Sequence, residues 1–594
     1  LFLWNGVRIF QTGHFFGLIS SFNPLLSNTI SITKNGTSAF FGESVSSLAN
    51  ISSHSKSNNT NHTRISSNLI SIAFYTKIRA SKNGSFKFSG RRSFSDLYSS
   101  PTYENYRDRI LQNTVVTNII SNKKVEFKSI EKFYFYDLTA HYQQKIGTKN
   151  ELNFNAIAIK NNLTVKQSYI GNNKKSDLNQ YNFGGTIDWK TDWNSNNYTT
   201  VYCSSSHYNL DSTNDFLQTD QIHYQQNSVL NFDIQLKNSH LISKNFIFNN
   251  GYQYNQIAVS NIDKINTPLY SRISKEVSTT HSLIAEGEFS SNNKKTFLKT
   301  GVRFNYFQKF DKTLIEPRVQ FSYSITDLIR LEILGEQKNQ TISQLIDLQN
   351  DFLGIEKKRW TLANDKNIPI QKSNQISVGF TFKNKSWLIT LENFYKKVSG
   401  ITSNGQGFQN QLEFNKLIGN YEVFGTEFLI QKSLKHFYTW LSYSFNDNNY
   451  HFETLSPSKF PNNYEFSHSL SWTGVYQWSN YKIALGSKWR TGNPTTTTQN
   501  NTLNFEEPIN LKINYNLPNN SRFPNYFQFN VSASKEWKLS KKTNIQASFS
   551  IQNLFNNKNI INRFYRINPQ NNSIESVETY SLERTPNFNI KVSF

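Results

Sequence analysis

The sequence alternates apolar and polar residues with a period of two along almost its whole length. In residues 545–551 (IQASFSI) every odd position is apolar and every even position is polar, and residues 527–534 and 319–325 follow the same pattern. Successive side chains of a β-strand point to opposite faces, so the pattern indicates strands whose two faces meet different surroundings. We therefore expect an all-β chain.

The predicted strands are long enough to cross a membrane. Marking every alternating run gives about 22 strands, and many of them extend over about 10 to 14 residues. Strands of soluble proteins have a mode of about 5 to 6 residues, whereas a tilted membrane strand needs about 9 to 11. No apolar run approaches the roughly 20 residues of a transmembrane helix. Because hydrocarbon tolerates no unpaired backbone groups, the expected fold is a closed transmembrane antiparallel β-barrel of about 22 strands.

Short and long connections alternate between the predicted strands. Outer-membrane barrels have short turns at one rim and long loops at the other, so this alternation places both ends of the barrel at the short-turn rim. Short connections are predicted near residues 81–84, 144–150, 192–196, 291–295, 383–386, 433–436, 478–481 and 538–543, and long ones near 94–128, 161–178, 209–220, 257–278, 338–372, 398–420, 447–464, 491–523 and 554–585.

Aromatic residues support the same geometry. Five tryptophans lie beside short turns, where an aromatic girdle of the membrane interface is expected. The final strand alternates as well and ends on the aromatic Phe594, which resembles the C-terminal targeting signal of bacterial outer-membrane barrels. We expect this strand to close onto the first one. The five tryptophans are Trp189, Trp193, Trp387, Trp478 and Trp537.

Composition narrows the class of protein further. The chain holds 48 Phe and 30 Tyr, too many for a disordered chain that buries no core. Its net charge of +23 suits a polyanionic partner, either nucleic acid or the phosphate-rich outer leaflet of a Gram-negative envelope, and it is equally explained by the Lys and Asn enrichment of an AT-rich genome. The single Cys203 excludes an intrachain disulfide and has no metal-ligand spacing around it.

Residues 1 to about 52 do not alternate like the rest, and their motifs resemble a known family. Residues 3–9 (LWNGVRI) resemble a strand and turn of the pattern hydrophobic-D-G-V, and residues 30–43 (ISITKNGTSAFFGE) resemble I-x-V-x-K-G-x-x-S-A-x-Y-G. Residues 45–51 stand where that family has S-G-V-V-N-I. With similar short motifs at 90–94, 316–318, 425–427 and 553–556, the whole chain resembles the TonB-dependent outer-membrane receptors of the Bacteroidetes type.

This resemblance implies a division of the chain and a function. Residues 1–56 are expected to be the C-terminal part of a plug domain inside the lumen, and residues 57–594 the barrel. The family imports a scarce nutrient, so we expect a receptor of the bacterial outer membrane that takes up a ferric siderophore or similar iron chelate. Its expected partners are the TonB complex, an extracellular small-molecule ligand, and outer-membrane lipid with lipopolysaccharide, but no nucleic acid.

Three departures from the family pattern stand out. Asn5 replaces the usual Asp, Ser47 replaces a usual Gly, and the first half of the plug with its TonB-contacting box is not present. We expect a chain without that box not to transport by itself. Gly36 and Gly42 are interpreted as turn positions or sites of close backbone approach rather than as ligand contacts.

No catalytic function is expected. The sequence has no G-x-S-x-G, H-E-x-x-H or P-loop motif, and its 11 His residues are scattered without metal-ligand spacing. We therefore predict no enzyme activity, no catalytic or metal-binding residues and no cofactor. The ligand must instead be held by aromatic faces and charge-assisted hydrogen bonds in the outer vestibule.

The candidate ligand-binding residues come from the plug and two long loops. In residues 10–17 the polar and aromatic side chains are placed where family plugs raise a loop toward the ligand, although the aromatic ones are equally explained by packing against the wall. The two loops mix tyrosine, tryptophan and basic residues that suit an anionic chelate or phosphate, although solvated loop charge is the commoner explanation. The candidates are Gln11, His14, Phe15 and Phe16 in the plug, Tyr103, Arg107 and Arg109 in the loop 94–128, and Arg359 and Trp360 in the loop 338–372. A wall that faces water is expected to account for Arg303 and Arg318.

Other functions stay open at this point. A TonB-dependent importer of another ligand, such as a vitamin, an oligosaccharide or a peptide, lies within the same family. A passive porin or a secretion barrel shares the alternation, but neither needs the plug-like segment 1–52.

Overall fold

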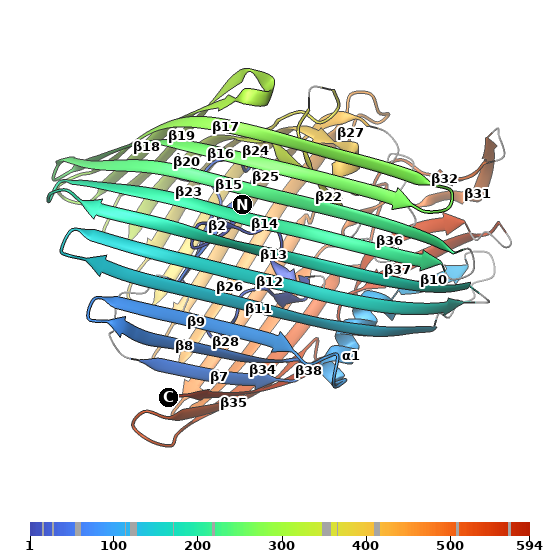
Figure 1. Cartoon of the computed structure of the whole chain (residues 1–594), viewed down its shortest axis with the longest axis horizontal. Coiled ribbons are helices and arrows are strands. Elements are labelled where there is room, and N and C mark those ends of the chain that lie inside the picture. Colours follow the sequence, from blue (N-terminus) through green and yellow to red (C-terminus); the bar gives the residue numbers. More distant parts are fainter. Residues whose placement is uncertain are drawn as a thin grey trace.

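The computed structural model forms one closed antiparallel barrel of 22 strands, as the sequence predicts (Figure 1). The structure describes residues 1–14, 17–26, 29–53, 61–112, 114–118, 128–169, 172–216, 220–346, 358–364, 366–408, 416–506, 510–567 and 572–594. Among these residues no helix is long and apolar enough to span a membrane.

Each barrel strand pairs with the next one along the chain. The strands are β7 (His62–Asn68), β8 (Ser71–Ser81), β9 (Gly84–Ser93), β11 (Lys128–Ile146), β12 (Asn150–Tyr169), β13 (Asn172–Asp192), β14 (Asn197–Phe216), β15 (Gln221–Ser243), β16 (Phe246–Ile265), β17 (Tyr270–Ser290), β18 (Thr296–Phe307), β19 (Lys312–Ser324), β20 (Ile329–Gln340), β23 (Gln371–Lys383), β24 (Trp387–Thr402), β25 (Ile418–Ser433), β26 (Phe437–His451), β28 (His468–Trp478), β29 (Tyr481–Arg490), β34 (Tyr526–Lys538), β35 (Asn544–Gln552) and β38 (Thr585–Ser593). The last strand closes onto the first, because β38 pairs with β7.

The outer face of the barrel carries the apolar residues of the alternating pattern. Phe549 and Phe588 are 48% and 41% exposed, and their neighbours Ser548 and Asn589 point to the lumen. The tryptophans at the short-turn rim are outward-facing too, and Trp478 stacks on Tyr481 with 5.3 Å between ring centroids. The predicted assignment of faces is confirmed for these strands.

The strands β11 to β17 are much longer than predicted. They have 19 to 23 residues each, whereas β28, β29, β34, β35 and β38 have 9 to 13. The predicted long loops at 161–178, 209–220 and 257–278 are therefore wrong for the most part. Beyond the membrane the pattern changes sense: apolar Leu163 and Val165 are buried toward the lumen, and the outward positions are polar. The hydrogen-bonded ladder continues in water, where no apolar outer face marks it in the sequence.

The remaining long connections carry small elements at the long-loop rim. The connection from β9 to β11 holds the helix α1 (Pro101–Arg107), the π-helical turn η2 (Asp108–Gln112) and β10 (Thr114–Asn118). The connection from β20 to β23 forms a hairpin of β21 (Ile342–Ile346) and β22 (Lys358–Leu362). The other elements are the 3-10 turns η3 (Gln308–Phe310) and η4 (Ser403–Gly405) and the strands β27 (Lys459–Pro461), β30 (Pro494–Thr495), β31 (Thr498–Glu506), β32 (Asn510–Tyr515), β33 (Ser521–Arg522), β36 (Ile560–Ile567) and β37 (Ile574–Tyr580).

The described residues of the segment 1–53 lie inside the barrel and form a plug. A four-stranded sheet has the order β2 (Val7–Arg8), β1 (Phe2–Trp4), β6 (Leu48–Ser52) and β5 (Thr29–Thr33), and a separate hairpin joins β3 (Gly13–His14) to β4 (Ile19–Ser20). Trp4, Val7 and Ile51 pack on Ile157 and Ile159 of the barrel strand β12. The predicted boundary between plug and barrel, at 56 and 57, lies outside the described residues.

Candidate functional site

The hairpin β3–β4 brings His14 into a buried polar cluster on the barrel wall. The ring of His14 is fully buried, with Nδ1 2.7 Å from Asn161 Oδ1 and Nε2 3.2 Å from Asp137 Oδ2, and it stacks on Phe135 at 4.1 Å. Arg91 Nε donates to the same Asp137 oxygen at 2.6 Å. Burial lowers the pKa of His14, and the carboxylate of Asp137 opposes that shift. The predicted candidate His14 therefore joins the plug to the wall.

The other plug candidates lie in the same hairpin. Gln11 is buried, and its Nε2 donates to the carbonyl oxygen of Gly13 at 3.0 Å. Its Oε1 is buried without a hydrogen-bond partner among the described residues. Phe15 and Phe16 lie outside the described residues, so their predicted role stays a prediction.

The hairpin β21–β22 folds into the lumen and places Trp360 against the plug. The ring of Trp360 meets the edge of Phe10 at 5.3 Å. Asn227 clamps the backbone of Trp360: its Oδ1 accepts from the Trp360 N–H at 3.0 Å, and its Nδ2 donates to the Trp360 carbonyl at 3.1 Å. The Nδ2 of Asn261 donates to the same carbonyl at 3.1 Å. This loop therefore covers the plug instead of standing free in solvent.

Arg359, on the same hairpin, faces a carboxylate on the wall. Its Nη2 lies 3.7 Å from Asp263 Oδ2, and the Nη2 of Arg272 lies 3.2 Å from the same oxygen. The other oxygen of Asp263 lies 2.6 Å from His223 Nε2. Arg359 therefore shares a single carboxylate with Arg272 and His223.

The candidates of the loop 94–128 belong to α1 and the turn after it. Ser100 caps α1 by accepting from the N–H of Tyr103. Tyr103 is buried, and that burial raises its pKa to about 12. Arg107 pairs with Asp108 at 2.9 Å and faces Glu131 at 3.9 Å. Arg109 is half-buried, which lowers its pKa.

One apolar cluster in the lumen unites the two loops with the plug. Its members come from the long strands and the inserted loops, and Phe10 and Trp360 pack against it. Tyr103 belongs to the cluster, and Arg359 lies beside it in β22. Every described candidate except Arg109 has a hydrogen-bond, ion-pair or packing partner among the described residues, so packing explains their positions; direct ligand contact stays a prediction. The cluster contains Ile70, Tyr103, Tyr106, Phe133, Phe135, Leu163, Val165, Leu178, Tyr208, Leu210, Val229, Ile257, Val259, Ile342 and Leu362.

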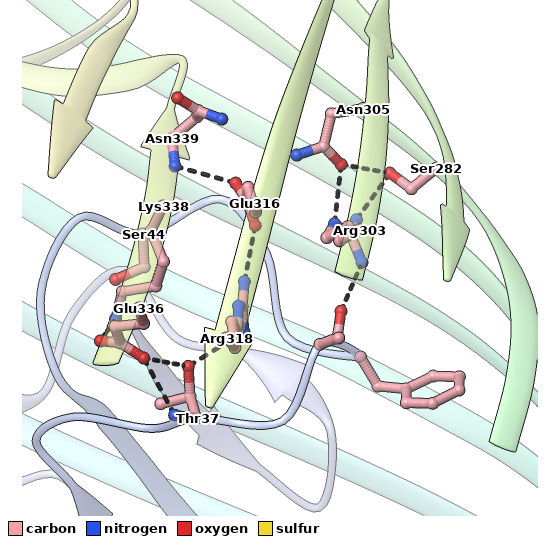
Figure 2. A network of polar contacts seen from close by, with 12 residues as sticks. Thr37, Ser44, Ser282, Arg303, Asn305, Glu316, Arg318, Glu336, Lys338 and Asn339 are labelled. Atoms are coloured by element: carbon pink, nitrogen blue, oxygen red, sulfur yellow. Dashed lines mark hydrogen bonds and ion pairs between the residues drawn. The ribbon is translucent and has the colours of Figure 1, made fainter. Parts of the chain in front are cut away.

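A second group of contacts anchors the plug to the wall formed by β17 to β20 (Figure 2). Glu336 Oε2 accepts from the N–H of Thr37 at 2.9 Å and from its hydroxyl at 2.7 Å. Arg318 Nη1 donates to the Thr37 hydroxyl at 2.9 Å, and Arg303 Nη1 donates to the carbonyl of Ala39 at 3.4 Å. The expectation that Arg303 and Arg318 face water is wrong: they are 2% and 5% exposed, because the plug covers them.

The two glycines of this plug segment are used for the reasons the sequence suggests. Gly36 has φ +66°, a left-handed conformation that favours glycine. A Cβ at Gly42 would lie 2.8 Å from Arg303 Nε, so only glycine lets the guanidinium approach. Both glycines therefore allow the plug segment to pack closely against the barrel wall.

The sequence did not reveal the carboxylates and amides that make these contacts. Asp137, Asn161, Asn227, Asp263 and Glu336 all occupy lumen-facing positions of alternating strands, and their side chains are buried, Asn161 at 4% exposure and Glu336 at 3%. Alternation places a polar residue in the lumen, but it does not say which of the many lumen residues meets the plug. A charged residue among neutral lumen positions is a signal that points to Asp137, Asp263 and Glu336, but it does not find the two amides.

The opposite part of the wall has a different inner surface. The lumen-facing side chains of β26, β28, β29, β34 and β35 are mainly hydroxyls, amides and a few cations, with Tyr438, Trp440 and Val475 among them near the short-turn rim. Most of them are half-buried, and Lys482 and Lys488 are exposed. We call this surface the open strip. It includes Ser442, Ser444, Ser469, Ser471, Thr473, Lys488, Arg490, Gln528, Asn530, Ser532, Ser548 and Ser550.

A shallow depression of about 510 Å³ lies on the outer wall, not in the lumen. Its floor is formed by Ala140, Ala156 and Gly185, which lie side by side on β11, β12 and β13, and Phe154 and Ile187 border it on their exposed outer faces. It is apolar and faces the membrane. We do not assign the solute site to it.

A family model described as TonB dependent receptor-like, beta-barrel, matches residues 132–554, which is more than half of the chain. The chain belongs to the TonB-dependent receptor family. The family and its fold are those of transporters and receptors. Whether the chain is of the Bacteroidetes type stays a prediction.

Solved structures of this family share the fold. The unliganded ferric citrate transporter FecA matches with a TM-score of 0.68 and 12% identity, over 100% of this chain and 88% of that one. The ferric yersiniabactin uptake receptor FyuA from Yersinia pestis matches with a TM-score of 0.67 and 11% identity, over 95% and 85%. The FrpB iron transporter from Neisseria meningitidis (F5-1 variant) matches with a TM-score of 0.68 and 8% identity, over 100% and 92%. No curated protein matches the sequence.

Proposed function

We propose that this receptor imports a scarce nutrient, a ferric siderophore or a similar iron chelate, across the bacterial outer membrane under the action of TonB. The observation that carries the proposal is a family barrel whose lumen holds a plug, with polar and aromatic loops gathered above it. The similar structures named above are iron transporters and receptors, which supports iron as the cargo.

The arrangement suits stepwise release of a solute. The long-loop rim faces outward, where aromatic and basic side chains meet the solute. The solute then passes between plug and wall once TonB pulls on the plug, so every contact that holds the plug resists that pull. The buried anchors at Glu336 and His14 would hold the plug until then. No catalytic step is assigned.

The test is uptake of radiolabelled ferric citrate and a panel of ferric siderophores by cells that express the parent receptor. We expect uptake of at least one chelate that disappears in an isogenic strain without TonB. Uptake that persists without TonB would move the protein to the passive porins, and TonB-dependent uptake of a vitamin, an oligosaccharide or a peptide alone would replace the cargo.

The plug candidates are tested in the same cells. If the hairpin β3–β4 contacts the solute, His14→Ala with Phe15→Ala reduces affinity roughly tenfold or more, because two contacts of about 1 kcal/mol each are lost. Heat-modifiable gel mobility checks that the barrel is folded. Unchanged affinity for a confirmed ligand would remove this hairpin from the solute site.

A further inference from the structure

Two cations on the open strip lack acidic partners. Lys488 and Arg490 occupy successive lumen-facing positions of β29, which places them on the same face and about 7 Å apart along the strand. Among the described residues neither has a carboxylate within ion-pair distance, and the charge that acts most on Lys488 is that of Arg490. Two like charges this close repel each other, and nothing on the described wall relieves that repulsion.

Three other cations of the lumen are paired with carboxylates, and two more, Arg303 and Lys87, donate to backbone carbonyls of the plug and are only 2% and 6% exposed. Arg91 pairs with Asp137 at 2.6 Å, Arg318 with Glu316 at 2.6 Å and Lys338 with Glu336 at 2.8 Å. The basic candidates that the sequence suggested, Arg107 and Arg359, face carboxylates as well. A solute anion would have to compete with these carboxylates, whereas it meets no competitor at Lys488 and Arg490.

Arg490 is held in place without being neutralised. Its guanidinium lies over the ring of Phe466 at 4.0 Å and over the ring of Tyr526 at 4.9 Å, and its Nη1 donates to Asn493 Oδ1 at 2.9 Å. Aromatic faces attract a guanidinium without cancelling its charge. Most of its N–H groups therefore stay free to donate to a planar oxyanion, for which the rigid fork of arginine is well shaped.

Neutral donors surround the two cations. Ser469 lies opposite Arg490 and Ser471 opposite Lys488 on β28, and Gln528 lies opposite Lys488 on β34. Lys488 is exposed to the lumen, so a solute reaches it without displacing protein. Hydroxyl and amide groups of this kind donate to an anion and add no charge of their own.

We propose that Lys488 and Arg490 form an anion-binding site that takes a carboxylate or phosphate group of the transported solute at the upper end of the open strip. This rests on the proposed function in one respect, namely that a solute passes through this lumen. In this proposal the basic residues that bind the solute lie on the wall strand β29, and not on the inserted loops as the sequence suggested.

The test uses the purified full-length receptor in detergent with sodium citrate and inorganic pyrophosphate as probes. Binding is measured by isothermal titration calorimetry at about 0.01 M ionic strength, where screening is weak. We expect Lys488→Gln with Arg490→Gln to weaken binding at least tenfold. The matched control is Lys482→Gln, which removes a cation from the same face of the same strand near the short-turn rim, and it should leave binding unchanged.

Charge-preserving variants separate the site from a folding defect. Lys488→Arg with Arg490→Lys keeps both charges and should bind within about threefold of the wild type, with the barrel checked by heat-modifiable mobility. The proposal is overturned if the wild type binds neither probe, if the double Gln variant binds as well as the wild type, or if Lys482→Gln weakens binding equally.

Cell uptake distinguishes a wrong site from a wrong function. TonB-dependent uptake that the double Gln variant leaves unchanged, for a solute shown to be anionic, would overturn the site and leave the proposed function standing. If TonB-dependent uptake of the anion is lost in the double Gln variant and kept in Lys482→Gln, both the anion site and the proposed function are supported.

Discussion

The inner surfaces of the two sides of the barrel differ in how far their side chains are buried. The inner face of β11 to β20, the packed wall, buries apolar residues and paired ions against the plug, as Ile157 at 3% exposure and Glu336 at 3% exposure illustrate. The open strip on β26, β28, β29, β34 and β35 presents half-buried serine, asparagine and glutamine. Each buried polar group of the packed wall needs a hydrogen-bond partner within the protein, whereas the polar groups of the open strip can form hydrogen bonds with water.

This difference separates two physical tasks. Buried hydrogen bonds and ion pairs are costly to leave unmade, so the packed wall holds the plug in one position. Exposed hydroxyls and amides exchange partners with water at little cost, so under the proposed function the open strip would be the surface along which a polar solute moves. The buried hydrogen bonds and ion pairs that hold the plug lie on other strands, and Val45 of the plug packs on Tyr450 of β26.

The largest expected contrast is in chemical accessibility. With Cys203→Ser as background, Ser550→Cys on the open strip and Ser206→Cys on the packed wall, which is 1% exposed, are treated with a membrane-impermeant maleimide. We expect Ser550→Cys to react roughly 100-fold faster, because labelling of the buried site requires an opening that costs about 3 kcal/mol. Equal rates would show that no such division of the wall exists in the membrane.

The next contrast is in packing. Trp4 is 1% exposed between the plug sheet and β12, so Trp4→Ala should lower the free energy of unfolding of the plug by about 3 to 5 kcal/mol. Ser532→Ala on the open strip is the matched change and should stay within about 0.5 kcal/mol. Urea denaturation followed by hydrogen exchange of residues 1–53 measures both. A small effect of Trp4→Ala would mean that the packed wall does not carry the plug.

Charged anchors should show the same division. Glu336→Gln leaves one carbonyl oxygen for Thr37 but removes the negative charge beside the buried Lys338, which costs about 3 kcal/mol of plug stability. Glu427→Gln removes the partner of Lys34, whose side chain is 56% exposed, and should cost about 0 to 1 kcal/mol. The same denaturation experiment compares the two. Equal costs would contradict the assignment of Glu336 as an anchor.

The smallest expected effect is a dependence on pH. Burial lowers the pKa of His14 in the folded plug, so the unfolded chain takes up a proton first, near the ordinary value of about 6.5. The contribution of His14 is therefore complete above about pH 6.5 and is lost as the pH falls toward the lowered pKa of the folded state. It should be about 1 kcal/mol.

The measurement is plug stability from pH 5 to pH 8 for the wild type and His14→Asn. The difference between the two should shrink as the pH falls, because only the wild type has a ring to protonate between Asp137 and Arg91. A difference that grows toward pH 5 would show that the ring is buried in its charged form.

The sequence was sufficient for the membrane-spanning part of the fold. Alternation, strand length and turn parity depend on the contrast between lipid and water, which every strand meets independently of its neighbours. Phe549 and Ser548 show it, since a single step along the strand separates the two surroundings. The long extensions of β11 to β17 were not predicted, because the contrast between lipid and water is absent above the membrane.

The site was less accessible to sequence reasoning. His14, Tyr103 and Trp360 lie around one cluster, because aromatic side chains that leave the membrane still need burial. Which charges are neutralised depends on pairs far apart in the chain, such as Arg359 with Asp263. No periodicity reports such pairs, so the structure was needed to show that Lys488 has no carboxylate partner among the described residues.

The seam of the barrel has a consequence for how the molecule is built. Strand β38 meets β7 over five residue pairs, Arg64 to Asn68 with Asn589 to Ser593, whereas β14 and β15 share twenty. These five join segments more than 500 residues apart, so the entropy of closing that loop must be overcome before the ring exists. Closure of the barrel is therefore a late step in assembly, and it is completed by the shortest ladder between barrel strands. Until then the unpaired edges of β7 and β38 can pair with strands of other chains. The entropic cost of closing the ring is thus offset at the seam by a few backbone hydrogen bonds rather than by the aromatic cluster in the lumen.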